Sequence, residues 1–355
     1  MPGSTGFTAE RIEESLARAR AFWQADTRGS LLSVYTAPAY RQQPDAEKMI
    51  RAACDCIRAD GAAGEENVLP CFWPDFGTVS TAAMWGGRII VPHKGQCIHI
   101  EPAARKAEEL EALQPLPFEK SDFQRAVGFY EEVRRRLGAN DVFVRTPDVQ
   151  GPLNTLSLVM DQVELMCAMY EHPDLIHAML DRITDLLIAT IRRYIQAVGA
   201  AKVIGNIWPY VILPADMGIA ITEDYMPLLG PDLYREFGIP YVKRMADAFG
   251  GLWIHCCGTY KQHLPALRAG GFRIWGLEAA YPQTPVWDVY EVFGDSIAYL
   301  VGVSPDGEKE FPGILDYARA ISRRPCAQGR FWFCTCHGLT DTAALKRLLA
   351  DSFGR

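Results

Sequence analysis

The chain has 355 residues, of which 49% are hydrophobic and 22% are charged, and its formal net charge is −7. This composition is typical of a globular protein, and the acidic balance argues against nucleic-acid binding, which needs a basic patch. No apolar run reaches the roughly 18 residues of a membrane span, and Met1–Gly6 lacks the features of a signal peptide. We therefore expect a cytoplasmic protein whose ten cysteines serve metal binding or reactive chemistry rather than disulfides.

Short apolar runs rich in Val, Ile and aromatic residues recur along the chain. Runs of this kind without strict alternation predict strands that are buried on both faces of a parallel sheet. In chain order, the expected strands are Leu31–Thr36, Asn67–Phe72, Asp141–Arg145, Lys202–Ile207, Leu252–Cys256, Arg273–Leu277, Ile297–Val303 and Phe331–Cys334.

Helical signals separate most of these strands. The segment Asp45–Arg58 has helical character, Ser121 is placed to cap the start of a second helix, and Gly138 is placed to end it. Pro173 begins a third helix at a position where its missing N–H costs little.

Eight expected strands with intervening helices predict an α/β fold, a (β/α)8 TIM barrel, as a single domain with an N-terminal helical extension. The alternative is a doubly wound open sheet, but no glycine-rich phosphate loop follows the first strand. We expect residues 1–30 to form a helical segment packed on the barrel and residues 31–355 to form the barrel. Active sites of such barrels lie at the C-terminal ends of the strands.

Two clusters of metal-binding residues lie at expected strand ends, namely His255–Gly258 and Cys334–His337. His255 and Cys257 are two positions apart, so on a strand they point to the same side and can bind one metal ion. A His/Cys/Cys site with one open position is typical of catalytic zinc, whereas structural zinc usually has four protein ligands. The alternative is that these cysteines are small apolar residues of the core.

Four further stretches of the chain fit a known pattern. They are Gly151-Pro152, Tyr170–Leu175, Leu233–Phe237 and Ile239–Arg244, and the last of them precedes the His255–Gly258 cluster. From about Gly151 onward the sequence resembles the uroporphyrinogen decarboxylase superfamily. The resemblance implies a (β/α)8 barrel and one of two activities, a metal-free decarboxylase or a zinc-dependent corrinoid methyltransferase. The His-x-Cys-Gly pattern is typical of the methyltransferase branch.

In that branch the His, the Cys that follows it and a Cys near the C-terminus hold the zinc, which implies His255 and Cys257 as ligands here. Cys334 lies six residues before Thr340, and the branch shows this spacing between the last ligand and the Thr that begins the last helix. We therefore expect Cys334 to be the third ligand, with Cys336 as the alternative.

The decarboxylase alternative is disfavoured by two features. True decarboxylases hold the porphyrin carboxylates with an N-terminal arginine pair, whereas Ala37–Arg41 contains a single arginine. Residues 151–161 also lack the tyrosine that the decarboxylases place there. A substrate with many carboxylates needs fixed cations, because unpaired buried charges are costly.

The resemblance implies transfer of a methyl group from a methylated corrinoid protein to a thiol such as coenzyme M or homocysteine, or to tetrahydrofolate. Zn²⁺ deprotonates a bound thiol and so generates the nucleophile. No Asp-x-His-x-x-Gly corrinoid segment occurs among the seven His residues, so we expect the corrinoid on a separate partner protein. A small-molecule methyl acceptor is the other partner, and the oligomeric state is left open. The alternatives are a lyase or other enzyme on this barrel and a non-catalytic zinc-binding module.

Other candidates follow the expected strands. Glu278 is expected to be a fourth zinc ligand or a proton acceptor, and Asp216 falls where the superfamily has an Asp-x-Gly segment near the substrate. Each has an ordinary alternative as a turn residue. The candidates for substrate binding are Asp75, Trp73, Trp208 and Trp275. The tryptophans would line an apolar pocket for a flat ligand. The alternative is that they pack in the hydrophobic core.

Overall fold

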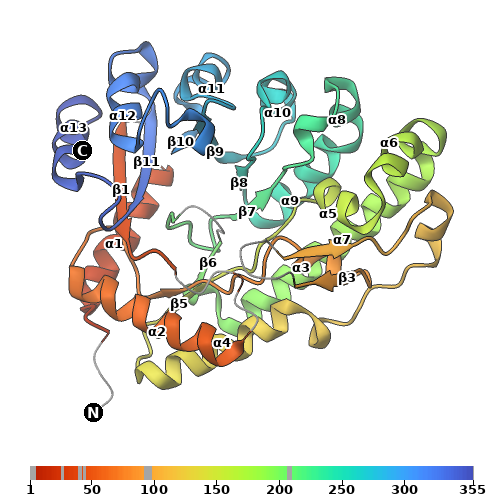
Figure 1. The fold of residues 1–355 in the computed structure, drawn as a ribbon, viewed down its shortest axis with the longest axis horizontal. Coiled ribbons are helices and arrows are strands. Elements are labelled where there is room, and N and C mark those ends of the chain that lie inside the picture. Colours follow the sequence, from red (N-terminus) through yellow and green to blue (C-terminus); the bar gives the residue numbers. More distant parts are fainter. Residues whose placement is uncertain are drawn as a thin grey trace.

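The structure is a computed structural model that describes residues 5–24, 28–38, 42, 45–91, 98–205 and 210–354. Its parallel strands form a ring, and the helices lie outside this ring (Figure 1). The parallel strands are β1 (Gly29–Tyr35), β2 (Cys71–Phe72), β5 (Phe143–Arg145), β6 (Val203–Ile204), β7 (Ile219–Thr222), β8 (Leu252–His255), β9 (Ile274–Tyr281), β10 (Ala298–Val303) and β11 (Arg330–Cys336). Outside the ring, β3 (Arg88–Ile90) and β4 (His99–Glu101) pair as an antiparallel hairpin.

Within the described residues, the order β1-β11-β10-β9-β8-β7 forms one six-stranded sheet and β2-β5-β6 forms a three-stranded sheet. The parallel pairing of β1 with β11 joins the first and last strands of the ring. A bridge between Gln150 and Thr222, and a hydrogen bond from Ala220 N to Gly205 O, connect the two sheets at β7. The predicted α/β barrel is confirmed by this arrangement.

The structure differs from the sequence prediction mainly at the fourth strand. The expected strand was Lys202–Ile207, but β6 covers only Val203–Ile204, and residues 206–209 lie outside the described part of the chain. Strand β7 is absent from the prediction because its run Ile-Ala-Ile-Thr is too short to show a clear periodicity. Strands β9 and β11 extend to Tyr281 and Cys336, so Glu278 and the last cysteines lie within strands.

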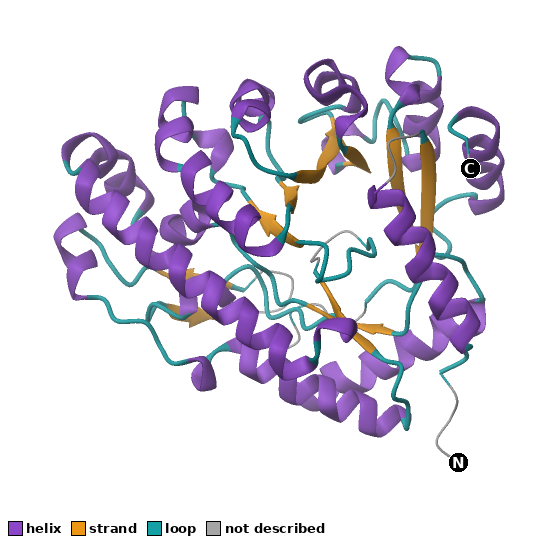
Figure 2. Ribbon diagram, turned by 180° about the vertical axis from the view of Figure 1, so that it is seen from behind, coloured by secondary structure: helices purple, strands orange, loops and turns teal. Residues whose placement is uncertain are grey.

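Helices cover the outer face of the ring, as is usual for parallel sheets (Figure 2). They are α1 (Ala9–Gln24), α2 (Ala46–Ala63), α3 (Ser80–Ala83), α4 (Asp122–Leu137), α5 (Pro152–Val159), α6 (Gln162–Glu171), α7 (Pro173–Val198), α8 (Pro231–Phe237), α9 (Ile239–Phe249), α10 (Leu264–Ala269), α11 (Val286–Phe293), α12 (Ile314–Ser322) and α13 (Thr342–Ser352). As predicted, Ser121 Oγ accepts from Gln124 N at 3.3 Å at the start of α4, and Gly138 ends it with a φ of 60°. Among the described helices, none combines the length and apolarity needed to cross a membrane.

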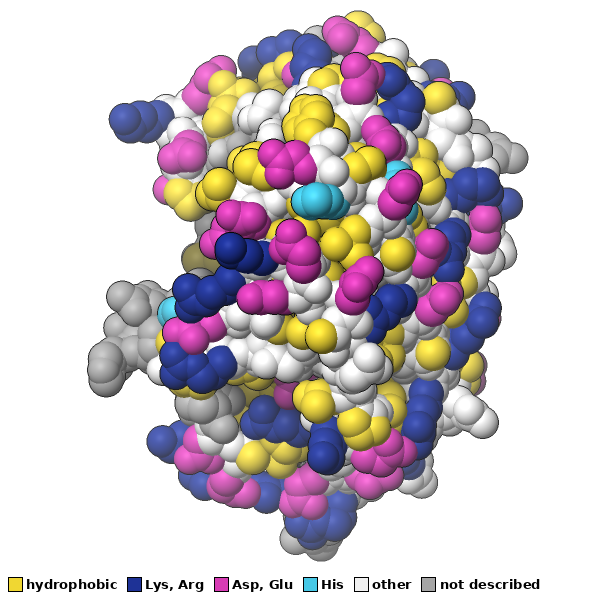
Figure 3. Space-filling view, turned by 90° about the vertical axis from the view of Figure 1, so that its right-hand side faces the viewer, with side chains coloured by type: hydrophobic (Ala, Val, Ile, Leu, Met, Phe, Trp, Pro, Cys, Tyr) yellow, Lys and Arg dark blue, Asp and Glu magenta, His cyan; other side chains and the backbone are white. Residues whose placement is uncertain are grey.

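The face drawn in Figure 3 has the mixed surface that is usual for a protein in contact with water. Acidic and basic side chains are interspersed there among small apolar groups, within the residues drawn in colour. This mixture agrees with the modest net charge of −7.

Helix α1 closes the N-terminal end of the ring. Arg330, the first residue of β11, donates to Phe22 O at 3.0 Å, and the Trp23 indole donates to Ile212 O at 2.7 Å. The rings of Trp23 and Trp332 stack with their centroids 5.5 Å apart. Phe22, Trp23 and Trp332 belong to one apolar cluster. The opposite end, where the parallel strands terminate, is the usual place of the active site in such barrels.

Candidate active site

A cavity of about 780 Å³ lies at the C-terminal ends of the strands, within the usual size range of small-molecule sites. Residues from almost every strand of the ring reach it. They include Tyr35, Trp73, Asp75, Asp148, Thr222, Asp224, His255, Cys257, Glu278, Val301, Cys334 and Cys336. Barrel enzymes place their active sites at this end.

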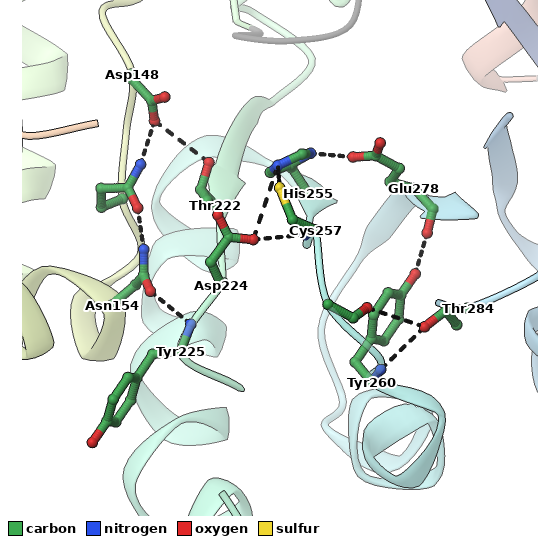
Figure 4. Close-up of polar contacts among 12 residues, drawn as sticks. Asp148, Asn154, Thr222, Asp224, Tyr225, His255, Cys257, Tyr260, Glu278 and Thr284 are labelled. Atoms are coloured by element: carbon green, nitrogen blue, oxygen red, sulfur yellow. Dashed lines mark hydrogen bonds and ion pairs between the residues drawn. The ribbon is translucent and has the colours of Figure 1, made fainter. Parts of the chain in front are cut away.

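Three side chains with metal-binding atoms converge in this cavity, namely those of Asp224, His255 and Cys257 (Figure 4). One ligand atom of each lies within 4.8 Å of the others. His255 Nε2 lies 3.0 Å from Cys257 Sγ and 3.9 Å from Asp224 Oδ1. His255 ends β8, and its neighbour in the sheet is Thr222 of β7, two residues before Asp224. Two adjacent parallel strands therefore deliver the whole group.

Glu278 contacts the other nitrogen of the same imidazole. Its carboxylate is hydrogen-bonded to His255 Nδ1, the ring nitrogen that does not face Cys257 (Figure 4). A carboxylate on the second nitrogen is the usual way in which proteins orient a metal-binding histidine. In the structure Glu278 thus orients His255, whereas the sequence prediction made it a zinc ligand or a proton acceptor.

The surroundings of His255 favour a positive charge at the imidazole. Burial alone would lower the pKa of His255, but Glu278, Cys257 and Asp224 together hold this pKa well above its usual range. A metal ion at Nε2 would satisfy the same carboxylate and thiol groups in place of a proton. The electrostatics of the group therefore suit a cation.

Neighbouring residues hold the loop after β8 in place. Cys257 N donates to Asp224 Oδ1 at 2.6 Å, which ties this loop to the end of β7. Tyr260 OH donates to the backbone oxygen of Glu278, and Thr284 Oγ1 accepts from Tyr260 N at 3.0 Å. The loop is thus fixed between β7 and β9, so the ligand atoms are positioned before any metal binds.

Cys256, the residue between His255 and Cys257, does not line the cavity. Cys256 is buried in the apolar core between the strands and the helices, and it is absent from the group formed by Asp224, His255 and Cys257. Burial raises the pKa of the Cys256 thiol far above its usual value. Cys256 therefore packs into the core, whereas His255 and Cys257 on either side of it line the cavity.

The two cysteines of β11 line the cavity but do not join the group. Cys334 Sγ lies 2.7 Å from Tyr210 O, and Cys336 lies beside Tyr35. Burial raises the pKa of both thiols. His337 is exposed, and its backbone N donates to Tyr35 O at 3.1 Å. Within the described residues, the group that comes together contains Asp224 and not Cys334, which the sequence prediction made the third ligand.

Two predicted site residues lie at the opposite end of the barrel. Asp216 is exposed and forms an ion pair with Arg20 of α1 at 2.9 Å. It precedes β7, so it lies at the start of a strand, and the prediction that it is catalytic is corrected here. Trp275 is the second residue of β9, and its indole donates to Met217 O at 2.8 Å near the closed end. Trp208 lies outside the described residues.

Two acidic side chains form the wall beside the metal-binding group. Asp75, a predicted residue, is buried and accepts from Gly77 N at 3.0 Å. Asp148 follows β5 and accepts from Gln150 Nε2 at 2.6 Å and Thr222 Oγ1 at 3.4 Å. Burial raises the pKa of Asp148 to about 7, opposed by His255 and assisted by Asp75.

Asp148 and Asp224 are the functional candidates that the sequence analysis missed. Each lies two or three residues beyond the end of a strand, so the rule that barrel sites follow strands would have included both. For Asp224 the rule failed because β7 itself was not predicted. Trp73, a predicted candidate for substrate binding, lines the cavity together with these acids.

The match to a family model and one of the two solved structures below agree with this fold. The family model described as uroporphyrinogen decarboxylase (URO-D) matches residues 76–298. The solved structure of a methyltransferase from Methanosarcina mazei aligns with a TM-score of 0.67 and 17% identity, covering 95% of this chain and 97% of that chain. A structure described as a vitamin-B12 independent methionine synthase from Listeria monocytogenes aligns with a TM-score of 0.44 and 12% identity, covering 98% and 96%.

No curated protein matches the sequence. The family model nevertheless spans more than half of the chain, and the barrel found in the structure is the fold that the sequence resemblance implied. This chain therefore belongs to the uroporphyrinogen decarboxylase family.

Proposed function

We propose that this protein is a zinc-dependent methyltransferase that moves a methyl group from a methylated corrinoid protein to a thiol or to tetrahydrofolate. The observation that carries the proposal is the convergence of Asp224, His255 and Cys257 in a cavity at the active end of the barrel. The family match and the methyltransferase of the same fold support an enzyme of this class.

The residues present fit a zinc ion. Imidazole nitrogen, thiolate sulfur and carboxylate oxygen are the donors that zinc takes in proteins, and a catalytic site keeps one position open. The cavity beside the group leaves that position accessible. Glu278 supplies the partner for the second imidazole nitrogen that such sites normally have.

The third protein ligand has two candidates. Asp224 completes the group that the structure brings together, whereas Cys334 completes the set expected from the sequence. Cys334 lines the same cavity, and a thiolate is the softer donor of the two. His255 and Cys257 belong to both sets, so the proposal depends on them first.

The cavity disfavours the decarboxylase alternative. Porphyrinogen substrates carry several carboxylates, which need cationic partners. Among the described residues that line the cavity there is no Lys or Arg, whereas Asp75, Asp148 and Glu308 are present. An acidic wall would repel such a substrate.

When bound, zinc would lower the pKa of an acceptor thiol so that it is a thiolate at neutral pH. The acceptor thiol would give its proton to solvent, its sulfur would form a bond to the methyl carbon, and the electron pair of the broken methyl–cobalt bond would stay on the corrinoid of the partner protein. In this chain Glu278 holds the His255 ring, and Asp224 holds the Cys257 backbone. These contacts hold His255 and Cys257, the two donors that belong to both ligand sets, close to one another.

The test is the zinc content of matched cysteine variants, measured by elemental analysis and X-ray absorption. Cys257→Ser should lose zinc and methyl transfer from methylcobalamin, whereas Cys256→Ser, whose side chain is buried in the core, should keep both. Unchanged zinc content in Cys257→Ser would overturn the proposal. Equal loss of zinc in both variants, with both still folded, would also contradict it, because Cys256 lies outside the group.

The third ligand is tested in the same way. Cys334→Ser should lower zinc affinity far more than Cys336→Ser if the sequence prediction holds. A large loss in Asp224→Asn, with zinc retained in Cys334→Ser, would assign the position to Asp224. An additional sulfur around zinc on addition of a thiol would support thiol activation.

A further inference from the structure

Two buried side-chain amides, those of Gln150 and Asn154, join the cavity wall to the loop after β7. Gln150 Nε2 donates to Asp148 Oδ1 at 2.6 Å, and Asn154 Nδ2 donates to Gln150 Oε1. Asn154 Oδ1 in turn accepts from Tyr225 N at 2.7 Å (Figure 4). We call Gln150 and Asn154 the amide chain, and it connects Asp148 with the residue that directly follows Asp224.

The two ends of the amide chain fix the direction of its hydrogen bonds. A backbone N–H can only donate, so the Asn154 atom that faces Tyr225 N is the amide oxygen. The Asn154 nitrogen then faces Gln150, whose oxygen accepts and whose own nitrogen is left to donate to the Asp148 carboxylate. Neither amide can turn over without leaving a buried polar group unsatisfied, which is costly. The chain is thus held in one arrangement from end to end.

The loop that the amide chain reaches is packed directly against the start of α5. Thr222 N, at the end of β7, donates to Val149 O at 2.9 Å, and Gly151 N donates to Thr222 O at 2.8 Å. Gly151 has no room for a side chain, because a Cβ there would strike the Glu223 carboxylate. Asn154 is the third residue of α5, so the helix presents its amide to the loop from a fixed position.

The other side of the same loop contacts the metal-binding group. Glu223 N donates to His255 O at 2.8 Å, and Asp224 Oδ1 accepts from Cys257 N at 2.6 Å. Asp224 Oδ1 also lies 3.9 Å from His255 Nε2. Tyr225, whose N–H is held by the amide chain, is the next residue, so a shift of its backbone would move the Asp224 carboxylate.

We infer that Asn154 is a positioning residue for the metal-binding group. By accepting from Tyr225 N, it places the Asp224 carboxylate within that group. Asn154 is not among the described residues that line the cavity, so it acts through Asp224 and not on a substrate. A buried N–H that loses its acceptor must find another, so the loop would rearrange without Asn154. The inference rests on the proposed function and adds a residue on which metal binding depends.

The test is metal binding by Asn154→Leu, which keeps a branched side chain but accepts no hydrogen bond. Zinc affinity is measured by competition with a chromophoric chelator, and the d–d absorption of the Co²⁺-substituted protein reports the geometry around the metal. We expect zinc binding to weaken about tenfold, the lower end of the range for residues that orient metal ligands. We also expect the d–d bands to change in energy or intensity, which a loss of stability alone would not cause.

Ser157→Ala is the matched control. Ser157 is buried in the same helix, and its Oγ donates to Asn154 O at 2.8 Å. The variant therefore removes one hydrogen bond from α5 and leaves the bond to Tyr225 N in place, so its zinc affinity and Co²⁺ spectrum should equal those of the wild type. Asn154→Ala, in which a water molecule can occupy the vacated space, is the second variant if Asn154→Leu folds poorly, and it should weaken zinc binding in the same direction.

A double variant identifies the route by which Asn154 acts. Asp224→Ala removes the carboxylate that Asn154 places, so adding Asn154→Leu to it should weaken zinc binding no further. Two residues that act independently would instead give losses that add in free energy.

The outcomes separate this inference from the proposed function. An unchanged zinc affinity and Co²⁺ spectrum in Asn154→Leu would overturn the inference and leave the methyltransferase proposal standing. An equal weakening in Ser157→Ala, or a full additional loss when Asn154→Leu is combined with Asp224→Ala, would also overturn it. Absence of zinc binding in the wild-type protein would overturn the proposed function, and the inference with it.

Discussion

Replacing Asp148 with Asn should make the free energy of unfolding of the metal-free protein less dependent on pH. Burial raises the pKa of Asp148 to about 7, with His255 opposing and Asp75 adding to this shift. In an unfolded chain an aspartate titrates near about 3.9, so between these pKa values the folded state binds a proton that the unfolded state lacks. The stability that this proton provides is complete in acid and is lost as the pH rises through the folded-state pKa.

The size of the effect follows from the two pKa values. Between about pH 5 and about pH 8 the shift corresponds to a loss of roughly 2.5 kcal/mol in the free energy of unfolding. This figure is an upper value, because Asp148 borders a cavity that solvent can enter and water screens its charge. Asn cannot titrate, but its side-chain oxygen can still accept from Gln150 and Thr222.

The assay is urea unfolding of the zinc-free protein at both pH values, followed by tryptophan fluorescence. The wild-type chain should lose more stability on going from the lower to the higher pH than Asp148→Asn does, by up to the amount given above. Asp216→Asn is the control, because Asp216 is exposed and paired with Arg20. If Asp148→Asn and wild type lose the same stability over this range, the argument that burial raises this pKa is refuted.

Two further predictions concern the orientation of the metal ligand and the closed end of the barrel. Glu278→Gln should weaken zinc binding by about 10- to 100-fold, because the His255 ring loses its charged partner. Competition with a chromophoric chelator measures this, and an unchanged affinity would show that Glu278 does not hold the ring. Trp332→Ala should cost about 3–5 kcal/mol, because it removes a fully buried ring that stacks on Trp23. Urea midpoints measure this, and a loss below about 1 kcal/mol would contradict the packing described here.

The sequence alone determined the features that depend on local periodicity. The alternation of strand side chains predicted that His255 and Cys257 point the same way, and their side chains do meet although β8 ends at His255. Helix ends at Ser121 and Gly138 were predictable for the same reason, since a cap acts on its own helix. The parallel barrel also followed from short apolar runs that alternate with helices.

Only the tertiary structure decided which distant residues join the site. Asp224 reaches His255 because β7 and β8 are paired, and Asp148 reaches Thr222 because the segment after β5 bridges to β7 at Gln150. Sequence spacing does not contain these pairings.

The exact ends of the strands also decided which predicted residues lie in the cavity. Asp216 and Trp275 were expected at the active end, but one precedes β7 and the other lies near the start of β9. In a parallel barrel the two ends of each strand face opposite sides of the molecule. An error of a few residues in a strand boundary therefore moves a side chain from the cavity to the closed end, and only the packed ring shows where each strand begins and ends.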